Sequence, residues 1–274
     1  PDSGKELSKE EIQIIRQWVA SGASFETHWS YSPPKRSPLP TVTNQEWPLQ
    51  PVDHFILSTL EVKGIKPSNE ASTSTLARRL HFDVTGLPPT PSEVDRFEQA
   101  YAKGQLTAYV RMFLHSPAYG ERMAVHWLDL VRFADTVGYH GDQDHSISPY
   151  RDYVIKSFNE NTPYDQFTRE QLAGDLLPDS DLWQKVASGY NRLLQTSHEG
   201  GVQDKEYLAK YAADRVRNFG LVWLGATTGC AECHSHKYDP YTIKDFYSLA
   251  AFFSDLKEQG AFNAPNSIPT RRDP

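Results

Sequence analysis

The sequence predicts an all-α protein, a multi-helix globular domain with few or no strands, and three observations support this fold class. Apolar residues recur at helical intervals through most of the chain, helix caps precede many of these stretches, and no stretch shows a convincing strand pattern. The chain has 274 residues, 38% of them hydrophobic, with 13 Phe, 14 Tyr and 6 Trp. This is enough apolar material for a packed core.

The first predicted helix begins near the N-terminal end, where Ser8 and Glu11 have the spacing of a capping box. Apolar residues then recur at helical intervals until Gly22 ends the segment. Residues 33–51 contain six prolines, which favour extended backbone, so residues 33–50 are predicted to form a linker.

Helix starts are well marked after this linker. Pro51 suits a first helical position, and Thr90, Pro91 and Glu93 combine a cap, a first-turn proline and a capping acid. A polar loop at 136–148 is either a flexible surface loop or a functional one. The predicted helices cover about 51–63, 75–81, 91–103, 107–114, 121–134, 150–159, 165–173, 204–224 and 243–253.

Both cysteines of the chain lie in the pentapeptide Cys230-Ala-Glu-Cys233-His234. Two thiols three residues apart in a helical turn share a face, where they can add to the two vinyl groups of one haem. The histidine that follows can supply the proximal imidazole to the iron. The pattern therefore predicts a single covalent c-type haem, held by Cys230, Cys233 and His234.

Two other interpretations of the pentapeptide stay open. Structural zinc could be bound by Cys230 and Cys233 with His234 or His236, although the sequence has no second paired-ligand module. A redox-active dithiol, a disulfide or free thiols are further alternatives, but a redox dithiol normally follows a strand, and none is predicted here.

Charge and hydropathy exclude two classes of partner. The net charge is −7 and no Lys/Arg run forms a phosphate-binding stripe, so nucleic acid is not expected. No segment approaches the roughly 18 consecutive apolar residues of a membrane span. Because the chain begins at Pro1, we expect a processed form or part of something longer. Covalent haem attachment implies export to the periplasm or an equivalent extracytoplasmic compartment.

Several further motifs carry a resemblance to a known family. They are Gly64-Ile-Lys-Pro-Ser68, Leu80-His-Phe-Asp-Val-Thr-Gly-Leu-Pro-Pro-Thr-Pro91, Ser116-Pro-Ala-Tyr-Gly-Glu-Arg122, His126-Trp-Leu-Asp129 with Arg132 and Asp135, Tyr150-Arg-Asp152, Glu170-Gln-Leu-Ala-Gly-Asp175, Glu199-Gly-Gly201, Asp214-Arg-Val216 and Gly229 through Pro240. Over residues 51–255 the chain resembles a planctomycete family of cytochrome-c-associated proteins whose central domain has no known function. The sequence departs from that family at Met123, where an aromatic is usual, and at Ser235, where an acid is common.

The resemblance implies a division of the chain. Residues 1–32 look like the tail of a preceding small cytochrome c-like domain, 51–260 form the helical haem domain, and 261–274 are a tail or a linker to a further domain. The family's gene context suggests extracytoplasmic redox chemistry linked to carbohydrate breakdown. The implied partners are a redox protein or an upstream cytochrome domain, and a carbohydrate is a further candidate.

The remaining ligands of the haem are predicted less directly. His126, on a helix with Asp129 and Phe133 along one face, is either a distal iron ligand or a histidine held in the core. His236 is either a hydrogen-bonding partner of a haem propionate or substrate, or a loop histidine. Arg215 either holds the propionates or belongs to a structural ion-pair network. Other candidates for the distal side are His140, His145, His198, Met112 and Met123.

The predicted function is electron transfer by a single-haem c-type domain within a larger redox protein. The main rival is a haem oxidoreductase acting on carbohydrate or a small oxidant through an open iron position, with His236, Asp135 or Glu199 handling protons. Two further alternatives are a structural zinc domain and a structural or carbohydrate-binding module in which the haem only stabilises the fold.

Overall fold

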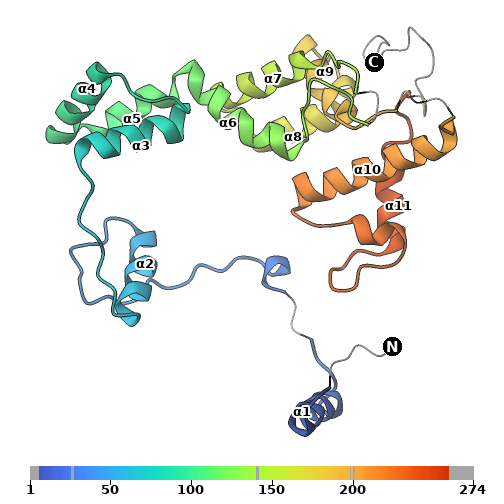
Figure 1. Cartoon of the computed structure of the whole chain (residues 1–274), viewed down its shortest axis with the longest axis horizontal. Helices are drawn as coiled ribbons and strands as arrows, with labels where there is room; N and C mark the ends of the chain where they lie inside the picture. Colours follow the sequence, from blue (N-terminus) through green and yellow to red (C-terminus); the bar gives the residue numbers. More distant parts are fainter. Residues whose placement is uncertain (1–5, 26–27, 140–141, 198, 200, 259–274) are drawn as a thin grey trace. The chain divides into compact units, whose positions relative to one another are not determined.

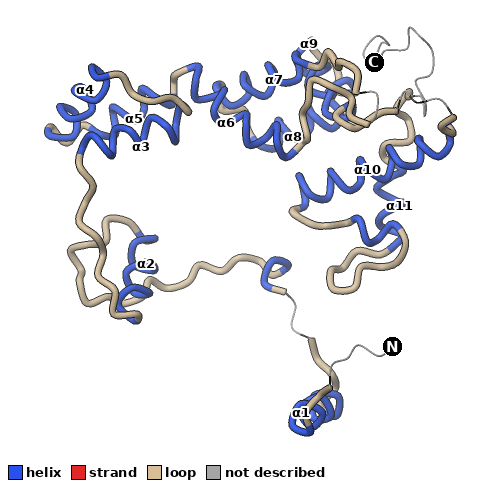
Figure 2. Tube along the Cα trace, viewed as in Figure 1, coloured by secondary structure: helices blue, strands red, loops and turns tan. Residues whose placement is uncertain are grey.

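The computed structural model describes residues 6–25, 28–139, 142–197, 199 and 201–258. In these residues it contains eleven α-helices and four short 3-10 helices. Figure 2 shows helices and loops without strands, and the only extended pairing in the described residues is an isolated bridge between Thr136 and Asp144. The all-α prediction is therefore confirmed. The chain divides into two compact units, residues 1–70 and 71–274.

The first unit contains two α-helices joined by a long extended segment. Its elements are α1 (Lys9–Ala20), η1 (Trp29–Tyr31) and α2 (Pro51–Val62). The predicted capping box of α1 is present, with Ser8 and Glu11 bonded in both directions at 3.1 and 2.7 Å. Residues 33–50 are free of helix, as a proline-rich segment should be, and the backbone N–H groups of Thr43 and Asn44 donate to the Glu61 carboxylate of α2.

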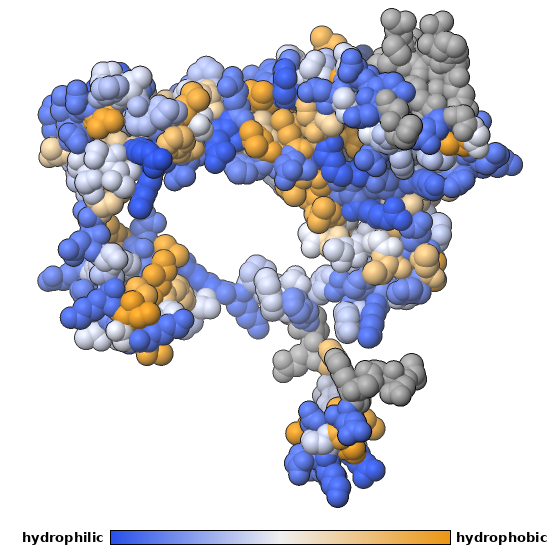
Figure 3. All heavy atoms as spheres, in the orientation of Figure 1, coloured by the Kyte–Doolittle hydropathy of each residue, from blue (hydrophilic) through white to orange (hydrophobic). Residues whose placement is uncertain are grey.

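Neither helix of this unit buries much of its apolar surface. All twelve residues of α1 are exposed, and α2 buries only Leu57. Figure 3 shows the remaining apolar residues of α2 as an orange area on its surface. They are Val52, Phe55, Ile56 and Val62.

The second unit begins with a three-helix cluster formed by α3 (Thr73–Thr85), α4 (Pro91–Ala102) and α5 (Leu106–Leu114) (Figure 1). Pro91 occupies the first turn of α4 and Glu93 completes its capping box, as predicted. The buried hydrophobic residues of this cluster are Ala77, Phe97, Tyr109 and Phe113.

A larger core follows, built from α6 (Pro117–Leu130), α7 (Ser148–Asn159), α8 (Tyr164–Ala173) and α9 (Leu182–Ala187), with η2 (Gly174–Leu176) and η3 (Ser188–Arg192). Helices α6 and α7 pack most closely, because Gly120 brings the two backbones together. A Cβ at position 120 would lie 2.5 Å from the carbonyl oxygen of Ile155. Val131, Tyr150, Tyr153, Val154 and Phe167 lie at the centre of this core.

The last part of the unit consists of α10 (Asp204–Leu224), η4 (Gly229–Glu232) and α11 (Ile243–Ala251). Helix α10 has the predicted bounds and ends where Gly225 adopts a left-handed φ of 59°. It contacts two cores. Val222 and Trp223 pack on the α6–α9 core, whereas Ala213 and Val216 pack beneath η4 and α11.

Some predicted boundaries were wrong. The helix predicted at 121–134 begins at Pro117 and ends at Leu130, because Arg132 has a left-handed φ of 61° and stops the helical path. Helix α3 is longer than predicted, and α9 was not predicted at all. Within the described residues no helix has the length and apolar character of a membrane span. The predicted tail at 261–274 lies outside the described residues.

Candidate functional site

The Cys230–His234 segment forms a tight turn directly after α10. The backbone N–H groups of Cys233 and His234 both donate to the Cys230 carbonyl, at 3.4 and 3.3 Å. Residues three apart in a 3-10 turn lie on the same side. The turn therefore presents Cys230 and Cys233 together.

Two residues between the cysteines fix this turn to the rest of the unit. Ala231 is completely buried and packs with Ala213, Val216 and Phe246. The carboxylate of Glu232 is ion-paired with Arg217 of α10. The Glu232 carbonyl also accepts a hydrogen bond of 3.1 Å from the Tyr247 hydroxyl of α11. The turn is thus anchored by its middle residues.

The two cysteines and the histidine of the motif are all exposed. Cys230 and Cys233 are free thiols, and His234 beside them is also exposed. The His234 Nδ1 atom lies 2.9 Å from the carbonyl oxygen of Ser235. A carbonyl only accepts, so Nδ1 carries the proton and the lone pair of Nε2 is available to a metal.

His236 occupies a different kind of position. Its Nδ1 accepts hydrogen bonds from the backbone N–H groups of Tyr238 and Asp239, at 3.3 and 2.8 Å. The main-chain N–H of His236 donates to the Tyr241 carbonyl over 2.7 Å. Nδ1 is therefore the acceptor, and in the neutral ring the proton lies on Nε2. His236 organises the loop before α11, which agrees with the interpretation as a loop histidine, while Nε2 stays free to donate.

The donor set fits a covalent c-type haem. The two thiols are free and on one side of the turn, and His234 is in the tautomer that an iron ligand needs. The two helices that hold the turn also carry exposed apolar side chains that a macrocycle could cover. They are Tyr247 on α11, and Leu221 and Leu224, which follow Arg217 along one face of α10. Cys230, Cys233 and His234 would hold the group.

The geometry offers less to a zinc ion. Structural zinc needs three or four ligands converging on one point. Among the residues that the structure describes, no group of three or more His, Cys, Asp and Glu side chains converges in this way.

Three of the predicted candidates for a distal ligand, Met112, Met123 and His126, lie on α5 and α6, which do not pack closely on η4; the principal neighbours of η4 are α10 and α11. His126 is exposed on α6, so the alternative of a core histidine is wrong, and Phe133 lies beyond the end of that helix. Met112 is exposed on α5, whereas Met123 is half-buried on α6. His145 is buried in the loop before α7. His140 and His198 lie outside the described residues.

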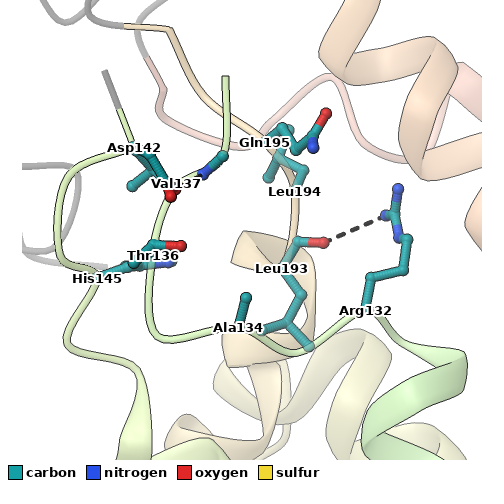
Figure 4. Close-up of a pocket in the computed structure, with 10 residues that line it drawn as sticks. Arg132, Ala134, Thr136, Val137, Asp142, His145, Leu193, Leu194 and Gln195 are labelled. Atoms are coloured by element: carbon teal, nitrogen blue, oxygen red, sulfur yellow. Dashed lines mark hydrogen bonds between the residues drawn. The ribbon is translucent and has the colours of Figure 1, made fainter. Parts of the chain in front are cut away.

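Four charged residues of the family motifs form two separate ion pairs. Arg132 pairs with Asp214 over 2.6 Å and also donates to the Leu193 carbonyl over 3.2 Å, the bond drawn in Figure 4. Arg151 pairs with its neighbour Asp152 at the surface, over 3.0 Å. Such pairs are the structural alternative that the sequence left open.

Arg215 is buried and fully engaged in the structure. Its Nη1 and Nη2 atoms donate to both carboxylate oxygens of Glu258, at 2.7 and 2.6 Å, and its Nε donates to the Asn191 carbonyl at 3.0 Å. A bidentate ion pair of this kind fixes the position of the guanidinium group. This position supports the structural interpretation of Arg215 and does not place it at the Cys-x-x-Cys-His turn.

The residues that hold the turn were not among the predicted site residues. Arg217, Glu232 and Tyr247 are brought together by the packing of α10, η4 and α11, which no local pattern specifies. The missed helix α9 did have a local signal. Asp181 and Gln184 form a capping box, with bonds of 2.8 and 3.1 Å.

Fold and site together define an all-helical protein with a single exposed Cys-x-x-Cys-His turn. Residues 51–258 match the family PSCyt2, described as a protein of unknown function (DUF1549), and the chain belongs to this family. The resemblance to the planctomycete cytochrome-c-associated domain is thereby confirmed. No curated protein and no solved structure matches the chain.

Proposed function

We propose that this domain attaches one c-type haem through Cys230 and Cys233, with His234 as the proximal ligand, and transfers electrons within a larger redox protein outside the cytoplasm. When bound, the haem would supply a one-electron iron centre. The observation that carries the proposal is the hydrogen bond from His234 Nδ1 to the Ser235 carbonyl, which leaves Nε2 free beside two exposed thiols.

The chain's own residues would have three tasks in this function. Ala231 and Glu232 hold the turn against α10 and α11, so that attachment occurs on a rigid support. Ser235 orients the His234 ring through its carbonyl. The exposed apolar residues Leu221 and Leu224 would supply apolar contact to the attached group and help to exclude water from it. The partner would be a redox protein or a neighbouring cytochrome domain.

The attachment is tested by expressing the chain with a c-type cytochrome maturation system. We expect a red protein that retains haem on a denaturing gel. The double variant Cys230→Ala/Cys233→Ala should lose covalent haem. His234→Ala should keep covalent haem but change the visible spectrum, because only the iron ligand is removed. A colourless wild-type protein holding one equivalent of zinc, lost in the same double variant, would contradict the proposal.

A second candidate function has one observation in its favour. Met112 and Met123 lie on α5 and α6, and His126 on α6, which do not pack closely on η4. An open iron position suits a haem oxidoreductase acting on a small oxidant or a carbohydrate, with His236, Asp135 or Glu199 as candidate proton-handling residues. Carbon monoxide and cyanide separate the two functions, because a carrier with both axial positions filled resists them and an open iron binds them.

A further inference from the structure

A cavity of about 1000 Å³ lies in the second unit, and nothing above gives it a role. Its walls come from the loop before α7 and the first turn of that helix, from η2, α9 and η3, from the segment at 194–196, from Arg215 of α10 and from residues 255–258. Small-molecule sites in proteins have volumes of roughly 300 to 1,000 Å³. This cavity is therefore large enough for a small organic ligand.

Two residues in its walls have a buried polar atom without a hydrogen-bond partner among the described residues. The atoms are Asn191 Oδ1 and Thr196 Oγ1, and the two residues are only 7% and 8% exposed. Both residues are held in place by other bonds. Asn191 Nδ2 donates to the Leu172 carbonyl over 3.3 Å, and the main-chain N–H of Thr196 donates to the Val137 carbonyl over 3.0 Å. Folded proteins rarely leave buried polar atoms without partners, so a ligand or a bound water is expected to supply them.

His145 adds a third polar side chain to the walls, and it is 7% exposed. Its hydrogen bonds within the described residues are made by the main chain, where its N–H donates to the Asp135 carbonyl over 2.6 Å and its carbonyl accepts from the Ile147 N–H over 2.9 Å. Burial lowers the pKa of His145, as does Arg192 to a smaller extent, while Asp135 opposes them. At neutral pH the ring is therefore uncharged, with one nitrogen that donates and one that accepts. His145 also lines the smaller cavity in Figure 4.

The buried charges in the walls are compensated within the protein. The Arg215 guanidinium and the Glu258 carboxylate form the bidentate pair described above, and Arg192 also has an interaction partner. The remaining charged groups are exposed and balance one another; they are Lys185, Lys257, Asp175 and Asp255. A charged ligand would lose its hydration here without gaining a free buried counter-charge among the described residues of the walls, so a neutral ligand is favoured.

Hydrogen-bond chemistry narrows the ligand further. An amide oxygen only accepts, so the ligand must bring a donor to Asn191 Oδ1. The Thr196 hydroxyl and the neutral His145 ring can each donate or accept, and a hydroxyl group on the ligand can meet either role. Val186 and Leu194 add an apolar surface on which a carbon skeleton can lie.

We propose that this cavity binds a polyol, that is a small neutral molecule with several hydroxyl groups, through hydrogen bonds to Asn191, Thr196 and His145. Its carbon skeleton would lie on the apolar part of the walls. Binding of this kind does not require haem attachment and would remain if that attachment failed.

Calorimetric titration of the full chain with four six-membered-ring probes tests the ligand class. Myo-inositol and D-glucose are neutral polyols, cyclohexanol has a single hydroxyl, and cyclohexanecarboxylate has a negative charge and no hydroxyl. We expect at least one of the two polyols to bind at millimolar concentrations, at least about tenfold more tightly than either of the other probes, the factor that about 1.4 kcal/mol gives. No binding of either polyol, equal binding of cyclohexanol, or tighter binding of cyclohexanecarboxylate would overturn the proposal.

A pair of matched variants tests the site. Thr196→Val keeps the shape and removes the hydroxyl without a partner in the described chain. It should weaken polyol binding about fivefold, the factor for one neutral hydrogen bond, and leave the melting temperature of the free protein unchanged or higher. The control is Thr85→Val, which removes a buried hydroxyl that donates 2.8 Å to the His81 carbonyl outside the cavity. It should lower the melting temperature and leave binding unchanged.

His145→Phe supplies a second variant, which keeps a planar ring and removes both ring nitrogens. It should also weaken polyol binding about fivefold, and it should leave cyclohexanecarboxylate binding no tighter than before, because only neutral hydrogen bonding is lost. Unchanged polyol affinity in both Thr196→Val and His145→Phe would place any binding elsewhere and contradict the proposed site. A lower melting temperature in Thr196→Val together with no polyol binding would do the same, because the hydroxyl would then serve bound water alone.

Discussion

The hydroxyl of Thr228 donates a hydrogen bond of 3.1 Å to the main-chain carbonyl of Val216, and both residues are almost completely buried. This bond fastens the segment immediately before Cys230 to the middle of α10. The approach is possible because Gly220 lies beside Thr228 on the helix. A Cβ at position 220 would lie 2.6 Å from both Cγ2 and Oγ1 of Thr228.

Gly220→Ala should therefore destabilise the turn that carries the cysteines. The new methyl group would have to displace Thr228, and overpacking of this kind costs about 1 to 3 kcal/mol, of which better helix propensity recovers up to about 1 kcal/mol. Urea unfolding measures the net loss. The yield of covalent haem should fall as well, since the turn loses its support.

The control for this variant is Gly189→Ala in η3. A Cβ there would meet its nearest neighbour, Tyr150 Cβ, at 3.7 Å, which is ordinary van der Waals contact. It should change the free energy of unfolding little. Equal effects of the two substitutions would show that the Thr228 contact does not limit the position of the turn.

Much of this fold could be predicted because its signals are local. The caps of α1 and α4 are predicted by side chains three positions apart, and the long periodic pattern of α10 predicts its bounds. The chemistry of Cys230, Cys233 and His234 was also visible, because the three residues are nearly adjacent in sequence.

What could not be predicted depends on residues far apart in sequence. Glu258 pairs with Arg215 forty-three positions away, and Asp214 pairs with Arg132 across eighty-two. The burial of α10 was only partly foreseen. Two cores contact it from different sides, so polar residues such as Asn218 are buried beside the apolar face that the periodicity marks.

His236 offers a prediction that separates loop structure from haem chemistry. Asparagine can place an acceptor near the position of Nδ1 but has no counterpart of Nε2. His236→Asn should therefore keep the hydrogen bonds from Tyr238 and Asp239 and retain stability, whereas His236→Ala should lose about 1 kcal/mol or more.

The reduction potential of the haem protein completes this test. If Nε2 contacts a propionate, His236→Asn should shift the potential while thermal unfolding stays the same. If both quantities stay at the wild-type values, His236 serves only the loop, and its predicted role in cofactor binding is wrong.

His81 predicts a pH dependence of stability in the α3–α5 cluster. It is buried against Phe113, and its Nε2 lies 3.3 Å from the Tyr109 hydroxyl, which itself donates to the Glu93 carbonyl. Burial lowers the pKa of His81, with Glu93 opposing and Arg96 adding a smaller decrease. The folded protein therefore resists protonation of this ring more than the unfolded chain does.

The sign of the effect follows from the lowered pKa. As the pH falls below about 6.5, His81 binds a proton in the unfolded chain before it does so in the folded protein, which favours unfolding. The stability that this group contributes above that pH is therefore lost as the pH falls through the pKa of His81 in the folded protein. His81→Gln should reduce this loss, measured by urea unfolding between about pH 7.5 and about pH 5.5. His145 acts in the same direction, so part of the dependence should persist. His115→Gln, at an exposed helix end, should leave it intact.

The pair between Arg215 and Glu258 allows the predicted haem role of Arg215 to be tested by a double-mutant cycle. Their side chains are only 8% and 18% exposed. Arg215→Met would leave the Glu258 carboxylate without its partner, and breaking a buried pair in this way costs about 3 to 5 kcal/mol. The double variant Arg215→Met/Glu258→Leu should recover most of that loss, because no buried charge is left uncompensated.

The same cycle measured with and without haem decides between the two roles. An arginine that serves only Glu258 gives the same coupling energy in both forms, above about 1 kcal/mol for a buried, two-pronged pair. An arginine that also holds a haem propionate keeps a charged partner when Glu258 is removed. Glu258→Leu would then cost little in the haem form, and the coupling energy would fall toward zero there while staying high in the haem-free form. Because three donors of Arg215 already bond to Glu258 and to the Asn191 carbonyl, we expect equal coupling in the two forms.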